Sequence, residues 1–189
     1  PVLNKYNFNY DKNKLTLFLE NKEIISISPD NLEERPFLSE KLSNLEKSLA
    51  KPIQLLKNEI FPFYDTSHSD NIFNSLSLIN LNSIKDFESK INREVEFERF
   101  RANFYVDGIE AWDEKNWINK IIRINNVSFK VEKNIPRCVA INLKPKTEES
   151  SFNMLQSLKN TYNDFDMGIY LIVLDSGNVN VGDKVKINN

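Results

Sequence analysis

The sequence is poor in the residues from which most recognisable catalytic sites are built. Its 189 residues include one cysteine, one histidine and four glycines. A single cysteine cannot form an internal disulfide, and a multi-histidine metal site needs more than one histidine. The chain also has no glycine-rich phosphate loop, no dinucleotide-binding glycine motif and no nucleophile elbow. These absences exclude most common enzyme classes.

Charge and hydropathy narrow the possible partners. The chain carries 25 basic and 27 acidic residues, so its net charge of -2 produces no general field that would hold a nucleic-acid backbone. Any anionic ligand must therefore be bound by a local cluster. No apolar run is long enough to cross a bilayer. We expect no nucleic-acid partner and no transmembrane segment.

The start of the chain and its cysteine content bear on location. No charged-then-apolar leader opens the sequence, and a lone cysteine is typical of a reducing compartment. We therefore expect a cytoplasmic protein. Because the chain begins at Pro1 without an initiator methionine, we also expect that an upstream segment is missing.

Strand patterns dominate the chain. Residues 15–19 and 23–27 flank the turn residues Asn21 and Lys22 and predict a hairpin. Residues 75–79 predict a further strand. From residue 103 onward, short apolar runs separated by glycine and asparagine turns predict strands at 103–106, 121–124, 127–131, 139–143, 168–174 and 181–187. This density of short strands indicates a closed or nearly closed barrel.

Three helices are predicted. The first covers residues 38–49, where Pro52 would end it, and its buried face would consist of Leu42, Leu45 and Leu49. Asn82 and Ser83 would cap the second, over 83–91, and the third covers 152–162. The length favours one hydrophobic core. We expect a mainly β fold with a few helices, in which a β-rich segment with one helix, 1–74, packs on a barrel core, 75–189.

His68 and the two tryptophans have simple structural interpretations. His68 lies in the polar stretch 65–70, which is typical of a solvated loop. Trp112 and Trp117 flank an acidic turn, and we expect them to pack at the rim of the core rather than to form a stacking platform.

Cys138 is the strongest candidate for chemistry. Strand alternation beyond Pro136 would place Arg137 and Cys138 on opposite faces. The neighbouring guanidinium would favour the thiolate, which binds soft metals or carries sulfur. The alternative is a small buried hydrophobic residue in a strand.

Arg101 and Asn103 form a second constellation. Two positions apart on a strand, they would share one face and offer a forked donor beside an amide, which suits a phosphate or a fused heterocycle. The alternative is that Arg101 is an exposed charge paired with Glu98 or Asp107.

These stretches, taken in order over residues 75–187, resemble the MOSC family, the domain of molybdenum-cofactor sulfurases and of the amidoxime-reducing component. The matching segments are Ser77-Leu78-Ile79-Asn80, residues 99–108 with their arginine and asparagine, residues 112–117, Pro136-Arg137-Cys138, and the closing strands at 166–170 and 181–185. One departure is that residues 1–19 lack the Pro-Val-Lys-Ser-type motif with which full-length relatives help to bind the cofactor. Either that segment lies upstream or the pocket is incomplete.

The resemblance implies a barrel of the pyruvate-kinase type with a molybdenum–pterin cofactor in a cleft. Cys138 would be the metal ligand and catalytic residue, and Arg101, Asn103 and Arg137 would hold the pterin or its phosphate. These residues should converge on one cleft, with Ser77 close to it. The family also carries an association with pyridoxal phosphate.

Three functions follow from this resemblance. The first is a molybdenum-dependent oxidoreductase that reduces N-oxygenated substrates and needs an electron-donor protein. The second is a sulfur carrier in which Cys138 bears a persulfide for an acceptor protein. The third is a non-catalytic binding module. Metal analysis separates the first from the others, and mass spectrometry of the thiol separates the second from the third.

Overall fold

The chain divides into two compact units. The computed structural model describes residues 2–49, 51–56, 75–150 and 152–188, so the loop of His68 lies outside the described residues. The first unit consists of Pro1–Tyr64 and Leu143–Ser150, and the second of Asp65–Asn142 and Ser151–Asn189. The domain division predicted between 74 and 75 stays a prediction. In the described part of the chain, no helix is long and apolar enough to cross a membrane.

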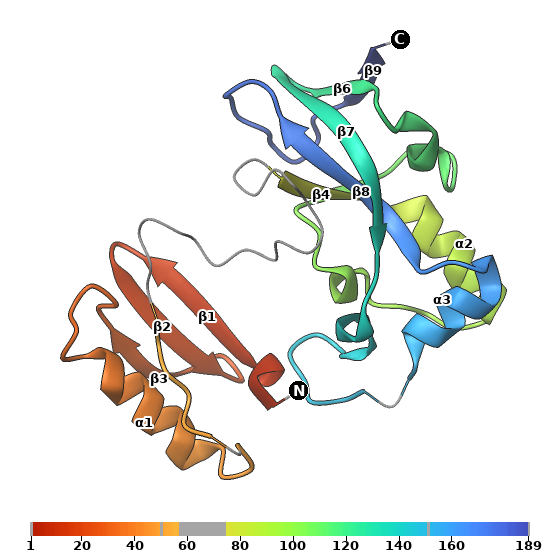
Figure 1. The fold of residues 1–189 in the computed structure, drawn as a ribbon. Coiled ribbons are helices and arrows are strands. Elements are labelled where there is room, and N and C mark those ends of the chain that lie inside the picture. The colour runs from red at the N-terminus through yellow and green to blue at the C-terminus, as the bar shows by residue number, and fades with distance from the viewer. Residues whose placement is uncertain (1, 50, 57–74, 151, 189) are drawn as a thin grey trace. The chain divides into compact units, whose positions relative to one another are not determined.

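The first unit is a small antiparallel sheet with one helix. A 3₁₀ turn η1 (Val2–Lys5) leads into strands in the order β1-β2-β3, followed by helix α1 (Figure 1). The bounds are β1 (Tyr6–Asp11), β2 (Lys14–Leu19), β3 (Lys22–Ile27) and α1 (Arg35–Leu45). The predicted hairpin is confirmed, but its turn lies one residue earlier than predicted, because Lys22 already belongs to β3. At its turn Glu20 and Asn21 take positive φ angles of 50° and 63°, the backbone that a two-residue hairpin turn requires.

Helix α1 differs from its prediction. It ends at Leu45, well before Pro52, so the proline does not terminate it. Leu38 and Leu42 are buried against the sheet, but the Leu45 side chain is 43% exposed, so the predicted buried face is wrong at that position. Tyr6, Leu17 and Ile27 complete the core of this unit.

The second unit is built on a curled six-stranded sheet, a half-barrel, with strand order β5-β4-β8-β7-β6-β9 (Figure 1). All neighbouring strands are antiparallel except β4 and β5. The register of β7 against β8 shifts twice, and such bulges bend a strand. The predicted class is therefore confirmed: mainly β, with three α-helices and a barrel-type sheet whose edges are β5 and β9 in the described residues.

Strands are the most frequent element of this unit. They are β4 (Ser75–Asn80), α2 (Leu81–Ile91), η2 (Phe97–Phe100), β5 (Phe104–Val106), η3 (Asp113–Trp117), β6 (Ile121–Ile124), β7 (Val127–Pro136), η4 (Val139–Asn142), α3 (Met154–Tyr162), β8 (Asp166–Val173) and β9 (Val185–Asn188).

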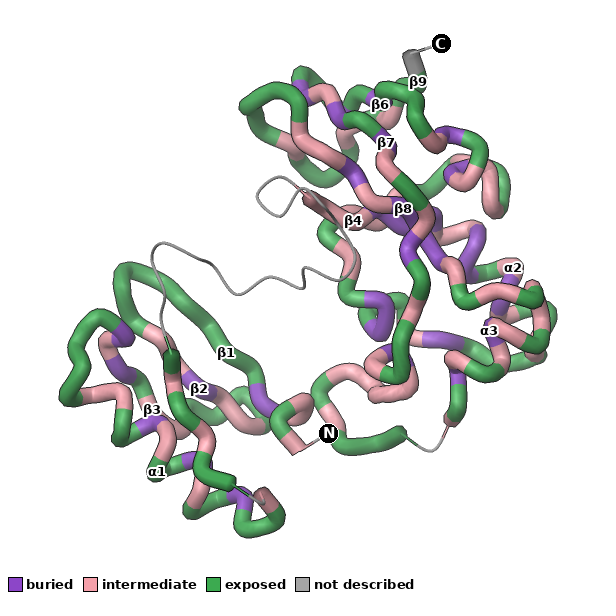
Figure 2. The backbone as a smooth tube through the Cα atoms, in the orientation of Figure 1, coloured by how far each residue is buried: buried purple, intermediate pink, exposed green. Residues whose placement is uncertain are grey.

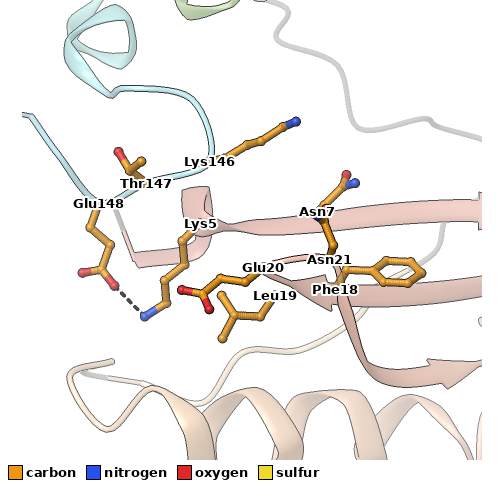
Figure 3. A pocket seen from close by; sticks show the side chains of 9 residues that line it. All are labelled: Lys5, Asn7, Phe18, Leu19, Glu20, Asn21, Lys146, Thr147 and Glu148. Atoms are coloured by element: carbon orange, nitrogen blue, oxygen red, sulfur yellow. Dashed lines mark hydrogen bonds and ion pairs between the residues drawn. The ribbon is translucent and has the colours of Figure 1, made fainter.

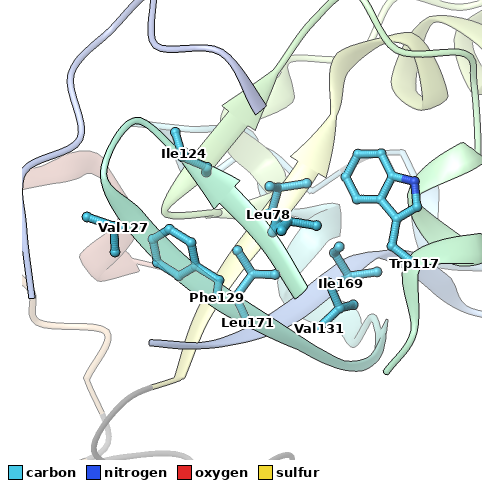
Figure 4. Packing of buried hydrophobic residues seen from close by; sticks show 9 residues of the cluster. Leu78, Trp117, Ile124, Val127, Phe129, Val131, Ile169 and Leu171 are labelled. Atoms are coloured by element: carbon cyan, nitrogen blue, oxygen red, sulfur yellow. The ribbon is translucent and has the colours of Figure 1, made fainter. Parts of the chain in front are cut away.

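Two apolar clusters form the core of the second unit. One lies between the curled strands and includes Leu78, Phe129, Ile169 and the fully packed Trp117 (Figure 4). The other joins α2 and α3 to the sheet through Phe87 and other buried residues, namely Ile79, Ile84, Leu158 and Met167. Strand β8 is buried at Met167–Ile169 and at Leu171 and so contributes to both clusters (Figure 2).

Several local predictions in this unit are wrong. The strand predicted at 181–187 begins only at Val185. The strand predicted at 139–143 is absent: Val139–Asn142 form the 3₁₀ turn η4, in which the amide of Ile141 donates to the carbonyl of Cys138. The cap of α2 is Asn80, whose side chain accepts from the Asn82 amide at 3.0 Å. Since β4 passes directly into α2, Ser83 lies inside the helix and is buried.

Candidate functional site

Cys138 lies on the surface at a turn. Strand β7 ends at Pro136 and η4 begins at Val139, so Cys138 occupies the junction between them. Its side chain is exposed, which contradicts the interpretation of a small buried hydrophobic residue. Because β7 ends at Pro136, the strand alternation predicted for Arg137 and Cys138 does not apply. The thiol is therefore accessible to a ligand or a reagent.

Arg137 binds backbone oxygen atoms on two neighbouring segments. Its Nε and Nη2 both donate to the carbonyl of Met167, the former at 2.7 Å, and its Nη1 donates to the carbonyl of Phe100 at 2.9 Å. Burial lowers the pKa of the Arg137 guanidinium to about 10, so it remains protonated at neutral pH. Arg137, the residue directly before Cys138, is thus bound to both β8 and η2.

Gly168 makes room for this anchor. Its φ is +82°, and a Cβ atom there would lie 2.5 Å from the carbonyl oxygen of Leu78 and 3.1 Å from Nη2 of Arg137. Only glycine avoids both the unfavourable φ and the overlap.

Arg101 also binds the turn that follows Cys138. It caps η2 in the left-handed region, with φ at 50°, and its Nη1 donates to the carbonyl of Ala140 at 2.9 Å. Because β5 begins only at Phe104, the prediction that Arg101 and Asn103 share a strand face is wrong. Arg101 nevertheless lies beside the segment that carries Cys138.

Arg99 is a third arginine between these segments, and no motif in the sequence predicted a separate role for it. Its side chain is 5% exposed; Nη1 donates to the carbonyl of Asn142 at 2.8 Å and Nε pairs with Glu96 at 2.7 Å. Arg99 begins the stretch that carried the resemblance, but no spacing in the sequence distinguishes a buried arginine from an exposed one. The three arginines together tie η2 to the chain that runs from Arg137 to Asn142.

Asn103 and Ser77 form a separate pair. The Asn103 Oδ1 accepts from both the amide and the hydroxyl of Ser77, each at 2.9 Å, and the Asn103 amide donates back to the carbonyl of Ser77 at 3.1 Å. Both residues lie where β4 meets the start of β5. Their mutual bonds explain why an asparagine suits this position.

A cavity of about 290 Å³ opens next to Asn103. Its walls are β5, Ile124 and the loop before β9, and its lining residues include Phe104, Tyr105 and Val185. Cys138 does not line this cavity. The convergence of Arg101, Asn103, Arg137 and Cys138 on a single cleft stays a prediction.

Tyr105 connects the cavity to the arginines. Its hydroxyl accepts from the amide of Ala102 at 3.0 Å and donates to the carbonyl of Phe97 at 3.2 Å. Burial raises the pKa of Tyr105, although the positive charges of Arg137 and Arg101 oppose this increase. Tyr105 therefore stays protonated and holds the loop of Arg101 in place.

The tryptophans are structural, but Trp117 lies inside the core and not at its rim as predicted. Trp117 is 2% exposed and belongs to the core, and Trp112 packs on Tyr162 with ring centroids 4.4 Å apart and donates from Nε1 to Asp86 at 2.7 Å. Among the described residues there is no group of three or more histidine, cysteine or acidic side chains placed to hold a metal ion.

Comparison with known proteins identifies relatives over most of the second unit. The family model described as MOSC domain matches residues 65–186. Mitochondrial amidoxime reducing component 2 of Rattus norvegicus is 28% identical over 134 residues, which cover 65% of this chain and 38% of the relative. The Bos taurus protein of the same name is 28% identical over 142 residues, covering 68% of this chain and 42% of the relative. The chain thus spans about two fifths of the length of these relatives.

A solved structure, that of YiiM from Geobacillus stearothermophilus, aligns with a TM-score of 0.46 and 14% identity. The alignment covers 60% of this chain and 54% of that one.

Proposed function

The chain belongs to the MOSC domain family, and we propose that it binds a molybdenum–pterin cofactor and reduces N-oxygenated substrates at a metal held by Cys138. One observation carries the proposal: the chain's single thiol is exposed at a turn that three arginines anchor. The name of the matched relatives, amidoxime reducing component, supports the substrate class, because an amidoxime contains an N–O bond that reduction cleaves.

The side chains around Cys138 fit such a cofactor chemically. A thiolate is a soft ligand that suits molybdenum bound by a pterin dithiolene, and this chain can supply one. The guanidinium of Arg101 is exposed beside the same turn and is of the type that binds phosphate in a forked geometry. An exposed sulfur donor and an exposed cation thus lie on neighbouring segments.

Each residue has a distinct part in the proposal. Cys138 would provide the protein ligand, and Arg101 would bind the anionic end of the cofactor. Arg137 would act as a positioning residue, since its donors already hold Met167 and Phe100. When bound, the cofactor supplies the two-electron chemistry, whereas the protein supplies position and charge.

The Asn103–Ser77 pair has a supporting part. Asn103 would line the approach to the cofactor. Ser77 would keep the side-chain amide of Asn103 oriented, because the Ser77 hydroxyl and backbone N–H both donate to Asn103 Oδ1. The electron-donor protein and a cytoplasmic location belong to the same proposal.

Metal analysis combined with a pterin assay of the purified chain tests the proposal directly. We expect molybdenum and pterin in comparable amounts after expression in a host that makes the cofactor. The proposal fails if the folded protein contains neither. If the same protein instead carries an additional sulfur atom on Cys138 by mass spectrometry, the sulfur-carrier function replaces it, and an unmodified thiol without molybdenum favours a binding module.

A further inference from the structure

Strand β1 is an edge strand of the sheet in the described part of the first unit. In the described sheet of the first unit it pairs with β2 alone, and every residue after Tyr6 is exposed. Phe8 is 44% exposed and Tyr10 is 56% exposed. Natural edge strands are commonly blocked by lysine, proline or a bulge, and residues 6–10 contain none of these.

The outward backbone groups of β1 can be assigned from its hairpin. Lys12 and Asn13 form a two-residue turn with φ angles of 48° and 62°, and Asp11 pairs with Lys14. In such a turn the closing pair is hydrogen-bonded, and bonded and non-bonded pairs then alternate along the ladder. The amide and carbonyl groups of Tyr6, Phe8 and Tyr10 therefore point away from β2.

Five of the six residues of β1 form a palindrome about Phe8. Residues 6–10 read Tyr-Asn-Phe-Asn-Tyr in either direction. Two antiparallel copies centred on Phe8 would place Tyr6 opposite Tyr10 and Asn7 opposite Asn9, so every pair matches its symmetry mate. Because successive side chains of a strand point to opposite faces, Tyr6, Phe8 and Tyr10 share one face, where cross-strand aromatic pairs are favourable.

The two ends of β1 carry opposite net charge. At the start, Lys5 lies 2.6 Å from the carboxylate of Glu148 (Figure 3). It also lies 2.7 Å from the carboxylate of Glu46, so these three groups together carry one net negative charge. At the other end, the turn carries one acidic and two basic residues: Asp11, Lys12 and Lys14. An antiparallel pair of β1 strands brings each negative end beside a positive turn.

We propose that a second copy of this chain docks on β1, antiparallel and centred on Phe8. The two three-stranded sheets then become one sheet of six strands with a two-fold axis through the Phe8 pair. The outward groups of Tyr6, Phe8 and Tyr10 would form on the order of six hydrogen bonds, two for each of the three pairs.

A charge-swap experiment tests the axis. Because Phe8 faces its own copy, Phe8→Lys places two ammonium groups opposite each other and Phe8→Glu places two carboxylates opposite each other. We expect the wild type to be a dimer in sedimentation equilibrium, each variant alone to be a monomer, and an equimolar mixture to recover the dimer. A wild type that stays monomeric at all concentrations overturns the proposal, as does a dimer that either variant leaves intact or a mixture that stays monomeric.

Cysteine cross-linking provides a second measurement that does not depend on charge. Hydrogen-bonded antiparallel pairs bring their Cα atoms to about 5.5 Å, within the range that a disulfide spans. Phe8→Cys in a Cys138→Ser background should form a cross-linked dimer on mild oxidation. The matched control is Leu32→Cys in the same background, since Leu32 is 70% exposed in the same unit but away from β1. Equal cross-linking of the two variants, or none at position 8, contradicts the proposal.

Discussion

Arg101 donates a hydrogen bond from Nη1 to the carbonyl oxygen of Ala140, 2.9 Å away. Arg137 in turn donates from Nη1 to the carbonyl oxygen of Phe100, the residue before Arg101, at 2.9 Å. Each arginine therefore binds the chain segment that carries the other. This reciprocal arrangement fixes the turn of Cys138 against η2, and it uses side chains about 36 positions apart in sequence.

Arg137→Ala should destabilise the protein strongly. The substitution removes all the guanidinium bonds to Met167 and Phe100 and leaves their carbonyls without these donors. We expect the free energy of unfolding to fall by about 2–4 kcal/mol in urea denaturation. The control is Arg123→Ala on β6, which removes an exposed arginine and should change stability by less than about 0.5 kcal/mol. Equal losses for the two variants would contradict the anchoring role.

Cys138→Ser should separate chemistry from folding. Since the thiol is exposed, its replacement should change the free energy of unfolding by less than about 0.5 kcal/mol. Serine supplies a harder oxygen donor, so reduction of an N-oxygenated substrate should be lost, although pterin can remain bound. Activity assays and pterin analysis on the same preparation measure both effects. Full activity with bound molybdenum would mean that the thiolate is not the ligand.

Arg101→Ala should act on cofactor retention. Removing the guanidinium takes away the proposed contact to the anionic end of the cofactor, so we expect the pterin content to fall about tenfold, the equivalent of about 1.4 kcal/mol in binding. Arg123→Ala again serves as the control and should retain the wild-type content. A decrease in activity without loss of pterin would place Arg101 in a different role.

Gly168→Ala should be far more costly than Gly108→Ala. Both glycines have positive φ angles, +82° and +75°, but a Cβ at Gly168 meets the backbone of Leu78 at 2.5 Å whereas one at Gly108 meets nothing within 4 Å. We expect a loss of about 1 kcal/mol at Gly108 from the backbone angle alone. At Gly168 the overlap should add about 2 kcal/mol or more. Similar melting temperatures for the two variants would show that the backbone shifts enough to remove the contact between the new Cβ and the Leu78 carbonyl.

Glu114 should make stability depend on pH. Its side chain is fully buried and accepts from Ser83 Oγ at 2.8 Å and Asn80 Nδ2 at 3.1 Å. Burial raises its pKa above 4.5, the ordinary value of a glutamate carboxyl. A carboxyl whose folded pKa is raised contributes stability that is present below 4.5 and is lost as pH rises through the folded pKa.

Glu114→Gln removes this dependence, because an amide cannot ionise. The free energy of unfolding of the variant minus that of the wild type should therefore increase from pH 4.5 upward and level off above the folded pKa. Urea denaturation at a series of pH values measures this difference. A difference that stays constant across the series would show that burial does not raise the pKa. The control is Glu33→Gln, which changes an exposed carboxylate.

Local features of the sequence determined the elements and the position of the reactive group. The hairpin at Asn21 follows from residues that tolerate positive φ, and the face of α2 at Ile84 and Phe87 follows from helical spacing. Cys138 was identifiable as the chain's single cysteine. Each of these features depends on residues a few positions away in the sequence, so the local sequence is enough to predict it.

Tertiary structure decided what those elements contact. The segment predicted as a strand at 139–143 contains the turn η4 instead, and Arg99 and Arg101 bind its carbonyls from a segment about 40 residues away. Nothing in its apolar pattern distinguishes a strand from such a turn. The exposure of Cys138 and the burial of Arg99 likewise depend on which distant segments approach them. Burial and hydrogen-bond partners are properties of the assembled chain, because they arise only when remote segments exclude water together.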